Sequence, residues 1–218
     1  TAIPKLLEML VLDGSVVTID AMGCQKKIAE KIIDNNGDYI FSLKGNHGTL
    51  HKEVKLFLDD AIANGGDYDY NHTTDGGHGR VEIRKVWCSQ DVRWMQDRED
   101  WSGLSSLVAV ESQRMIGDEI SIERRYFISS LSCINAETIG HMIRSHWGVE
   151  NKLHWSLDVS FGEDDCRIRK GFGAENVSRL RRIALNLLKQ EETAKCSIKA
   201  KRNKAGWDEK YIQKLLGI

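Results

Sequence analysis

The first 64 residues alternate between two kinds of apolar pattern, and this alternation limits the folds open to the chain. Apolar residues recur at helical spacing within residues 3–11, 25–35 and 49–63, which predicts three helices. Between them lie two short apolar runs, Val16–Ile19 and Tyr39–Leu43, typical of strands buried on both faces. The order helix, strand, helix, strand, helix predicts a parallel pair with helical crossovers, and therefore an α/β core.

The middle third of the chain has a different pattern. Residues 65–79 are rich in Gly, Asp and His, which predicts an exposed loop. Three segments then alternate or run apolar like strands, and Gly117-Asp118 predicts a turn between the last two. These segments are Arg80–Cys88, Ser106–Met115 and Ile120–Leu131. Together they predict an antiparallel β insertion.

Helical spacing returns from Ala136 onward. It predicts helices at residues 138–161, 174–190 and 208–216. Trp147 and Trp155 lie eight residues apart in the first of these helices, so both are expected to pack in the core. We therefore expect three parts, at residues 1–64, 65–135 and 136–218.

Composition is typical of a globular protein, with 41% hydrophobic and 29% charged residues. No window approaches the length of apolar run that a membrane span needs, and the first residues lack the pattern of a secretory signal. We therefore expect no membrane partner and a cytoplasmic location. The first residue is not Met and the chain opens inside an expected helix, so we expect a fragment of a longer protein.

Charge is distributed unevenly, although the net charge is only −1. Residues 166–218 hold 14 Lys and Arg against 5 Asp and Glu, whereas the preceding residues hold 17 against 27. This asymmetry indicates either a nucleic-acid-binding end beside an acidic cation site, or a solvated basic helix with a basic tail. In the first case the basic run Lys195–Lys204 is expected to be flexible and to touch the DNA backbone.

Three residues that bind metals or transfer protons recur at four-residue steps, namely His146, Glu150 and His154. On one helix they would form a single stripe. Asp20 directly follows the first apolar run, where ligands of an open α/β sheet gather. Simpler roles stay open: a helix cap for Asp20, a surface ion pair for Glu150, and half-buried, hydrogen-bonded rings for the histidines.

The stripe is compatible with two kinds of metal chemistry. Zinc favours imidazole and its catalytic sites use three protein ligands, but the His-Glu-x-x-His spacing common in zinc hydrolases is absent. The alternative is carboxylate chemistry on two Mg²⁺ ions, which activate water and stabilise the leaving oxygen in phosphodiester cleavage. Asp20 and Glu150 would then bind metal, while Arg179, Arg181 and Arg182 would contact phosphates.

Several segments together resemble the DDE insertion-sequence transposases, specifically the H-repeat-associated family linked to Rhs elements. They occur in family order and cover essentially all 218 residues. The segments are Val17–Gln25, Leu43–Asn46, His78–Arg80, Arg125–Leu131, Trp147–Asp158, Arg181–Leu188 and Ala205–Asp208.

This resemblance implies a ribonuclease-H-like core with a β-rich insertion before the helix that carries the last acid, followed by a C-terminal helical region. In that family two Asp and one Glu bind two Mg²⁺ (or Mn²⁺) ions. Asp20 matches the second Asp and Glu150 the Glu. The first Asp belongs to a strand upstream of the segment that matches Thr1, so the core is expected to be N-terminally truncated, with an open sheet edge.

Neighbouring families also carry a Tyr-Arg-Glu-Lys signature, from which this chain departs. With Glu150 aligned, Ile143, His146 and Leu157 stand at the Tyr, Arg and Lys positions. DNA contacts are therefore expected from a wider set of residues. That set is Lys44, Asn46, Arg144, His146, Lys152, His154, Arg179, Arg181 and Arg182.

The function implied by the resemblance is transposition by metal-dependent DNA strand cleavage and strand transfer. Expected partners are double-stranded DNA, as element ends and target, and a second copy of the protein on that DNA, in the bacterial cytoplasm at the nucleoid. The chain alone is expected to be inactive because the first Asp is absent. Two other classes stay open, a non-catalytic DNA-binding relic and a zinc hydrolase that uses His146, Glu150 and His154.

Overall fold

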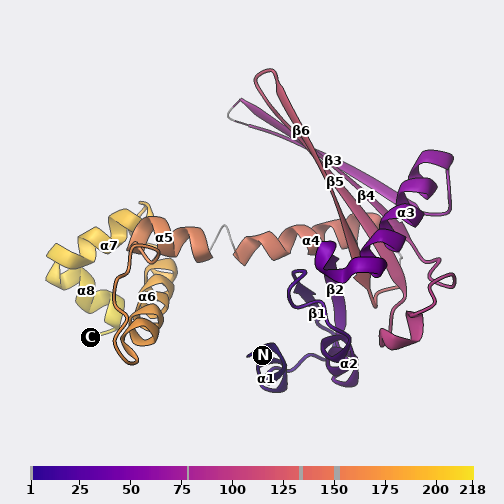
Figure 1. The fold of residues 1–218 in the computed structure, drawn as a ribbon. Coiled ribbons are helices and arrows are strands. Elements are labelled where there is room, and N and C mark those ends of the chain that lie inside the picture. The colour runs from indigo at the N-terminus through magenta and orange to yellow at the C-terminus, as the bar shows by residue number, and fades with distance from the viewer. Residues whose placement is uncertain (1, 78, 133–134, 150–152) are drawn as a thin grey trace. The chain divides into compact units, whose positions relative to one another are not determined.

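The computed structural model describes residues 2–77, 79–132, 135–149 and 153–218. These residues form a mixed α/β protein that divides into two compact units, Thr1–His146 and Trp147–Ile218 (Figure 1). The elements of the first unit are α1 (Ala2–Glu8), β1 (Val16–Ile19), α2 (Lys26–Asp34), β2 (Asp38–Leu43), η1 (Gly45–His47), α3 (Gly48–Asn64), β3 (Asp69–Gly77), β4 (Arg80–Ser89), η2 (Arg98–Asp100), β5 (Ser106–Ile116) and β6 (Glu119–Ser129). Helix α4 (Ala136–Val149) follows, and the second unit contains α5 (Trp155–Phe161), α6 (Gly173–Gln190), α7 (Ile198–Trp207) and α8 (Glu209–Leu216).

One six-stranded sheet organises the first unit, in the order β1-β2-β6-β5-β4-β3. Strands β1 and β2 are parallel, as their helical crossover predicts, and the other pairs are antiparallel. The predicted turn at Gly117 joins β5 to β6. The φ of this residue is +57°, in the left-handed region that glycine adopts more readily than other residues. Because β6 pairs with β2, the β-rich middle third continues the same sheet as β1 and β2.

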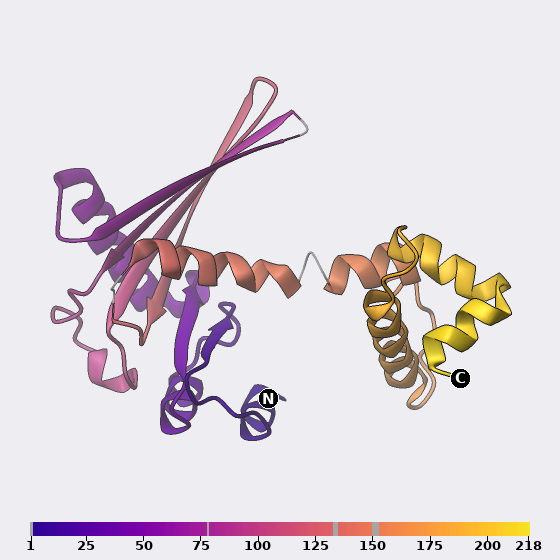
Figure 2. The same cartoon turned by 180° about the vertical axis from the view of Figure 1, so that it is seen from behind.

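Two helices cover opposite faces of this sheet, α3 on one and α4 on the other (Figures 1 and 2). The larger core lies on the α3 side and contains Phe41, Leu58 and Ile128, each fully buried. A smaller core lies on the α4 side, where Ile139 and Ile143 pack against the sheet. The sheet is therefore buried on both faces near its middle, as an α/β core requires.

Two expectations about the strands are wrong. Residues 65–79 are not a loop throughout, since β3 pairs with β4 along its whole length. Most of its side chains are exposed, so backbone hydrogen bonds hold the strand and no apolar pattern marks it. Strand β1 is half-buried instead of buried on both faces, because it forms one edge of the sheet.

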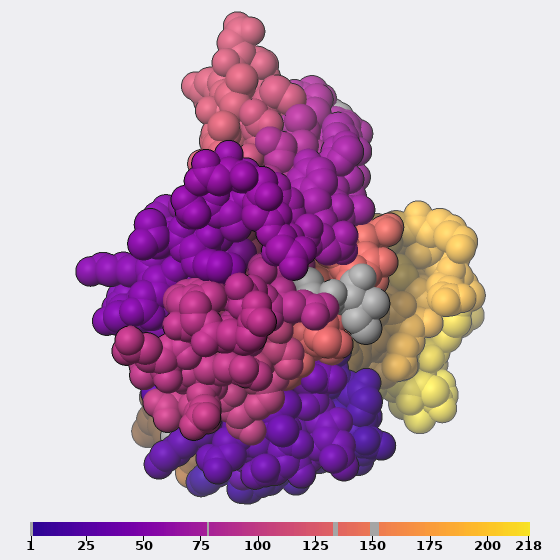
Figure 3. Space-filling view, turned by 90° about the vertical axis from the view of Figure 1, so that its right-hand side faces the viewer, coloured from indigo at the N-terminus to yellow at the C-terminus, as the bar shows by residue number. Residues whose placement is uncertain are grey.

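Strands β3 to β6 project beyond the rest of the first unit at the ends where β3 meets β4 and β5 meets β6 (Figure 3).

The second unit is helical, as its spacing predicts, with two corrections. The basic run Lys195–Lys204 is not a flexible tail, because most of it belongs to α7, whose first turn is capped by the Ser197 hydroxyl accepting from the Ala200 amide. Trp147 and Trp155 are 43% and 61% exposed, so they do not pack in the core as expected. The inward positions of α5 are occupied by smaller residues, chiefly Leu157.

The predicted helix at residues 138–161 corresponds to α4 and α5. Residues 150–152 between them lie outside the described residues, so the continuity of the predicted helix stays a prediction. Within the described part of the chain, no helix is long and apolar enough to span a membrane.

Candidate active site

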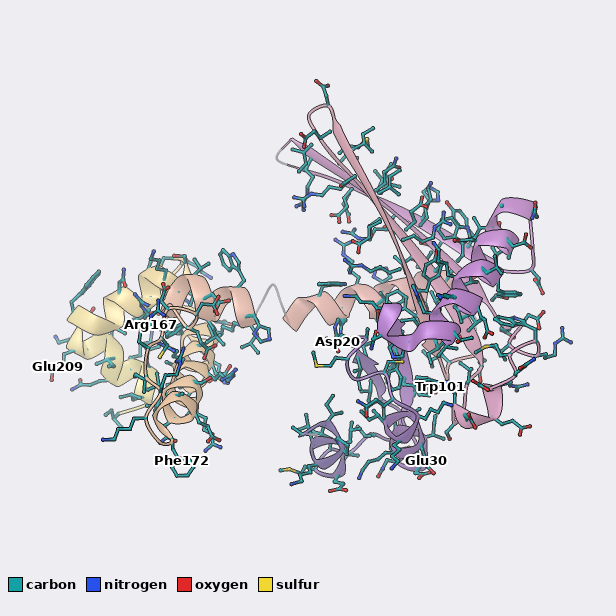
Figure 4. The ribbon with its side chains drawn as sticks, in the orientation of Figure 1. Asp20, Glu30, Trp101, Arg167, Phe172 and Glu209 are labelled. Carbon is teal, nitrogen blue, oxygen red and sulfur yellow. The ribbon has the colours of Figure 1, made fainter. Side chains whose placement is uncertain are left out.

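Asp20 lies in the loop that follows β1, at the carboxyl end of that strand (Figure 4). Its backbone carbonyl accepts from the Gly23 amide at 3.1 Å, which closes a tight turn. Helix α2 begins only at Lys26 with Gln25 as its N-cap, so a capping role for Asp20 is excluded. Asp20 is exposed, and no side chain among the described residues bonds to its carboxylate. An acid in this state is available to a ligand.

Gly23 allows this turn to fold back on the strand. A Cβ atom at this position would lie 2.3 Å from Ile19 Cγ2 and 3.0 Å from Ile3 Cδ1. Any larger residue would therefore displace the loop that holds Asp20. Glycine at position 23, three residues after Asp20, thus has a steric reason to be there.

Alternation along β1 assigns the strand residues to the two faces of the sheet. Val17 and Ile19 pack against the core on the α3 side, whereas Val16 packs against the core on the α4 side. Side chains two residues apart share a face, so Thr18 lies on the α4 side with Val16. Asp20 is two residues beyond Thr18, so the same alternation assigns it to the face that α4 covers.

A hydrogen bond joins β1 directly to α4. The Thr18 hydroxyl and His146 Nδ1 lie 3.1 Å apart, and the imidazole tautomer decides which of them donates. Helix α4 approaches the sheet closely because Gly140 faces Val86, where a Cβ would lie 2.9 Å from Val86 Cγ2. The last turns of α4 in the first unit are thus held beside the strand that leads to Asp20.

The loop after β2 is tied to the loop after β1. The Asn46 amide donates to the Ala21 carbonyl at 2.9 Å, and His47 Nε2 lies 3.0 Å from the Cys24 carbonyl. Lys44 is exposed beside them. The Asn46 side chain, expected to contact DNA, thus contacts the backbone of the Asp20 loop and supports that loop.

Arg144 of α4, expected to contact DNA, forms an ion pair within the protein. Its guanidinium donates to Asp75 of β3 at 2.6 Å, and Arg84 donates to the same carboxylate at 2.9 Å. The hydrogen bond and charge of Arg144, with a smaller contribution from Arg84, lower the pKa of the Asp75 carboxyl. Asp75 stays ionised near neutral pH and orients Arg144, a partnership that the sequence analysis did not find.

Other predicted site residues are not brought together by the described structure. Glu150 and Lys152 lie outside the described residues. His154 is an exposed residue of the second unit, directly before α5. Among the residues that the structure describes, no group of three His, Cys, Asp or Glu could hold a metal ion. The zinc stripe and the Asp20–Glu150 pair therefore both stay predictions.

The three arginines of α6 each have a partner inside the second unit. Arg179 pairs with Glu175, and Arg182 contacts the Ser178 hydroxyl and lies 3.8 Å from Glu163. A backbone hydrogen bond from Ile168 and the Arg181 side chain lower the pKa of the Cys166 thiol. Exposed pairs of this kind are weak, so the arginines keep their capacity to contact phosphates.

Comparison with known proteins identifies the class. A family model described as "Transposase DDE domain" matches residues 1–187, so the chain belongs to the DDE transposase domain family. It is 42% identical, over 99% of its length, to "H repeat-associated putative transposase YhhI" and to "Putative protein YbfL", both of Escherichia coli (strain K12). It is 40% identical, again over 99% of its length, to "Putative transposase YncI" of Escherichia coli O157:H7. The resemblance to the H-repeat-associated family is confirmed.

The chain does not span the full length of these relatives. It covers 58% of YhhI, 58% of YbfL and 56% of YncI. The activity, substrates and partners of the whole protein are therefore matters for proposal.

Proposed function

We propose that this chain forms part of the active site of a transposase that cuts DNA strands and joins them to a target. Asp20 and Glu150 are the proposed metal ligands, within a ribonuclease-H-like core. One observation carries the proposal: the Thr18–His146 hydrogen bond holds α4 beside the strand that ends at Asp20. Glu150 follows His146 by four residues, one helical turn in the sequence period, which favours a meeting of the two acids.

The chemistry of Asp20 fits a hard divalent cation. Mg²⁺ and Mn²⁺ prefer carboxylate oxygens, and the Asp20 carboxylate is exposed and unbonded among the described residues. Bound metal would lower the pKa of water and stabilise the leaving oxygen of a phosphodiester. The protein's part is to hold Asp20 in a tight turn, anchored through Asn46, and to hold α4 on the same face of β1.

Basic residues of the second unit are the proposed DNA contacts. Residues 166–218 carry the excess of Lys and Arg, and phosphate contacts position DNA without reading its sequence. Arg179, Arg181 and Arg182 on α6 are the first choices in the second unit, and Arg144 and Lys44 are the candidates in the first unit. Such contacts weaken as salt rises, because each releases counterions from the DNA.

The test is strand transfer by a longer protein that contains this chain together with the third acid. Loss of a metal ligand should remove about 4 kcal/mol of transition-state stabilisation, so Asp20→Asn and Glu150→Gln should each slow transfer by about 10³-fold. Asp13→Asn, which changes an exposed acid before the same strand, is the matched control and should keep full activity. Undiminished transfer by Glu150→Gln would refute the site.

A linked expectation concerns the 218-residue chain itself. It contains two of the three acids assigned to the site, so we expect it to bind DNA in a salt-dependent manner without nicking it. Robust metal-dependent cutting of element-end DNA by this chain would contradict that assignment. DNA binding without nicking even in the longer protein would favour the second candidate, a non-catalytic DNA-binding relic, which the basic C-terminal residues also support.

A further inference from the structure

Strand β3 lies at one edge of the sheet and pairs with β4 alone among the described strands. We propose that this free edge pairs antiparallel with β3 of a second copy of the chain, which joins the two sheets into one. The pairing centres on Thr73, so a two-fold axis passes between the two strands at that residue. It does not depend on the proposed metal site.

The free edge of β3 is long and regular. It pairs with β4 over nine residues, Asp69–Gly77, in one continuous register without a bulge. The opposite edge strand, β1, has only four residues. Sheet edges are usually protected from further pairing by short strands, bulges, Pro or charged side chains, especially Lys. Strand β3 contains neither Pro nor Lys, so its charged residues decide whether the edge is protected.

Both acids of β3 are already bonded inside the first unit. The Asp75 carboxylate accepts from Arg84 and from Arg144. The Asp69 carboxylate accepts from the Tyr70 amide at 2.9 Å and from the Ala136 amide at 2.6 Å. Neither acid is therefore a free charge that would repel another strand.

Alternate residues of β3 direct their backbone groups away from β4, as in any antiparallel edge strand. The Tyr70 amide bonds to the Asp69 side chain, which assigns the even-numbered residues of the strand to this outward set. His72, Thr74 and Gly76 belong to it. Within the part of the chain that the structure describes, no residue outside β4 bonds to their backbone groups. These groups are available to a further strand.

One antiparallel register matches β3 to a copy of itself along its whole length. When Thr73 lies opposite Thr73 of the second copy, His72 lies opposite Thr74, and every residue of the strand has a partner. Tyr70 then lies opposite Gly76. Outward residues therefore meet outward residues, as hydrogen-bonded pairs require. Thr73 forms a pair without backbone hydrogen bonds, where opposite side chains approach closely.

The charges of the strand favour the same register. Asp75 lies opposite Asn71 of the second copy, and Asp69 lies opposite Gly77, so no acid faces an acid. A shift by two residues in one direction would place Asp69 opposite Asp75, and like charges directly opposite are destabilising. A shift in the other direction would leave the start of β3 unpaired.

Gly76 gives independent support for a second copy. Its φ lies outside the left-handed region, and a Cβ atom there would meet no described atom within 4 Å. Neither the backbone nor packing within one copy therefore requires glycine. In the register centred on Thr73, Gly76 lies opposite Tyr70 of the second copy. Tyr70 is 44% exposed, with its ring centroid 5.5 Å from that of Trp87, and a glycine opposite leaves room for this ring.

Sedimentation velocity of the 218-residue chain measures the association. Edge pairing buries less surface than a standard interface, so a monomer–dimer equilibrium is expected at about 5–500 µM. Thr74→Pro removes an outward donor without removing a bond to β4, and should weaken association at least about tenfold. Thr74→Val keeps the amide and should associate like the native chain. A monomer at every concentration, or a dimer that Thr74→Pro leaves intact, would overturn the inference.

Cysteine cross-linking tests the register without a change to the backbone. Thr73→Cys places two thiols opposite each other, with Cα atoms about 4.5 Å apart, and mild oxidation should produce a covalent dimer. Asn71→Cys is the matched control on the same face of β3. Its two copies would lie about 13 Å apart along the strands, too far to cross-link. Both variants carry Cys166→Ser and Cys196→Ser, since these free cysteines are not buried. Equal cross-linking of the two variants would overturn the proposed register.

Hydrogen exchange resolved by residue distinguishes pairing at β3 from association through another surface. The outward amides of His72, Thr74 and Gly76 should exchange quickly in dilute protein and about tenfold more slowly at the concentration where the dimer dominates. The amides of Asn71 and Thr73, which face β4, should be protected at both concentrations. A dimer in which the outward amides still exchange quickly would overturn the inference.

Discussion

The two units of the molecule differ in the interactions that stabilise each of them internally. The first unit is built on a sheet with apolar cores on both faces, and Phe41, Leu58 and Ile128 are among its fully buried side chains. The second unit buries fewer large apolar residues and contains two buried charges, Glu191 and Lys201. Apolar packing tolerates conservative substitution, whereas a buried ion pair fails when one partner is removed. Different kinds of substitution should therefore destabilise the two units: removal of buried apolar side chains in the first, and removal of a buried charged partner in the second.

Glu191 connects three helices of the second unit. It follows α6, accepts from the Tyr211 hydroxyl of α8 at 3.0 Å and from Lys214 Nζ at 3.1 Å, and its backbone carbonyl accepts from Lys201 of α7. The hydrogen bond from the Thr193 hydroxyl is the main cause that lowers the pKa of the Glu191 carboxyl, in spite of its desolvation. Its charge is therefore retained near neutral pH, and the helices depend on it.

The largest effect is expected in the first unit. Leu58→Ala removes a fully buried side chain of α3 and leaves a cavity, so it should destabilise that unit by about 3–4 kcal/mol. Hydrogen exchange resolved by residue should show faster opening of β2, β5 and β6, and unchanged protection of α6 to α8. Leu56→Ala, at a 73% exposed position of the same helix, is the control and should cost less than about 0.5 kcal/mol. Equal loss of protection in both units would show that they do not unfold separately.

Lys201→Met is expected to have a smaller effect on stability, and this effect should fall on the second unit instead of the first. Lys201 Nζ donates to the Leu188 carbonyl at 3.2 Å and also contacts Glu191, so its loss leaves buried acceptors without a donor. The second unit should lose about 2 kcal/mol, visible as faster exchange in α6 to α8 with β2 and β5 unaffected. Lys199→Met changes an exposed lysine of the same helix and should be neutral. Neutrality of both variants would contradict the structural role of the buried charge.

The smallest effect concerns an ion network between α3 and the sheet, and it depends on pH. Burial raises the pKa of the Asp59 carboxyl, but hydrogen bonds from Tyr126 and Arg124 outweigh burial and lower it. The Glu111 carboxyl behaves in the same way, since hydrogen bonds from Arg124 and Lys85 lower its pKa in spite of burial. A lowered folded pKa adds stability above the unfolded pKa, and this stability is lost as pH falls through the folded value. Arg124→Met should therefore cost about 1–2 kcal/mol at neutral pH.

The difference between Arg124→Met and the native chain should shrink as pH falls below about 4, where the carboxyls of the unfolded chain begin to take up protons, and should vanish only below the lowered pKa values of the folded protein. Urea unfolding at several pH values, followed by hydrogen exchange of β5 and β6, measures it. A difference that stays constant down to pH 3 would mean that packing of Arg124 on Trp87 accounts for its contribution instead of charge.

The sequence predicted elements wherever apolar residues mark one face. Helices α2, α3 and α6 and strands β2, β4, β5 and β6 have such faces, and each lies close to its predicted position. Strand β3 was missed because its partner supplies backbone hydrogen bonds and its side chains face solvent. The burial of β1 was overestimated because composition does not tell whether a strand lies at the edge of a sheet. The order of strands in a sheet depends on contacts between residues distant in sequence, and local sequence patterns do not indicate such contacts.

The proposed site was inferred from a residue type that is unusual for its position. Asp20 after an apolar run is such a residue; its carboxylate is exposed and has no side-chain partner among the described residues, and its role as a metal ligand stays a prediction. Thr18 gave no signal, since threonine is an ordinary strand former. Asp75 and Glu191 were missed for a similar reason, because acids in polar segments are common and their partners lie in other elements. Such roles become visible only when side chains distant in sequence are placed next to each other.

The central claim is that residues 20 and 150 bind the same divalent ion. The most direct measurement is nuclear magnetic resonance of the 218-residue chain during Mn²⁺ addition, since the paramagnetic ion broadens only nearby signals. We predict that the amides of the Asp20 loop and those around Glu150 broaden together, at one metal concentration, and that Asp20→Asn abolishes both effects. Broadening of only one of these segments, or its persistence in both segments of the Asp20→Asn variant, would contradict the account.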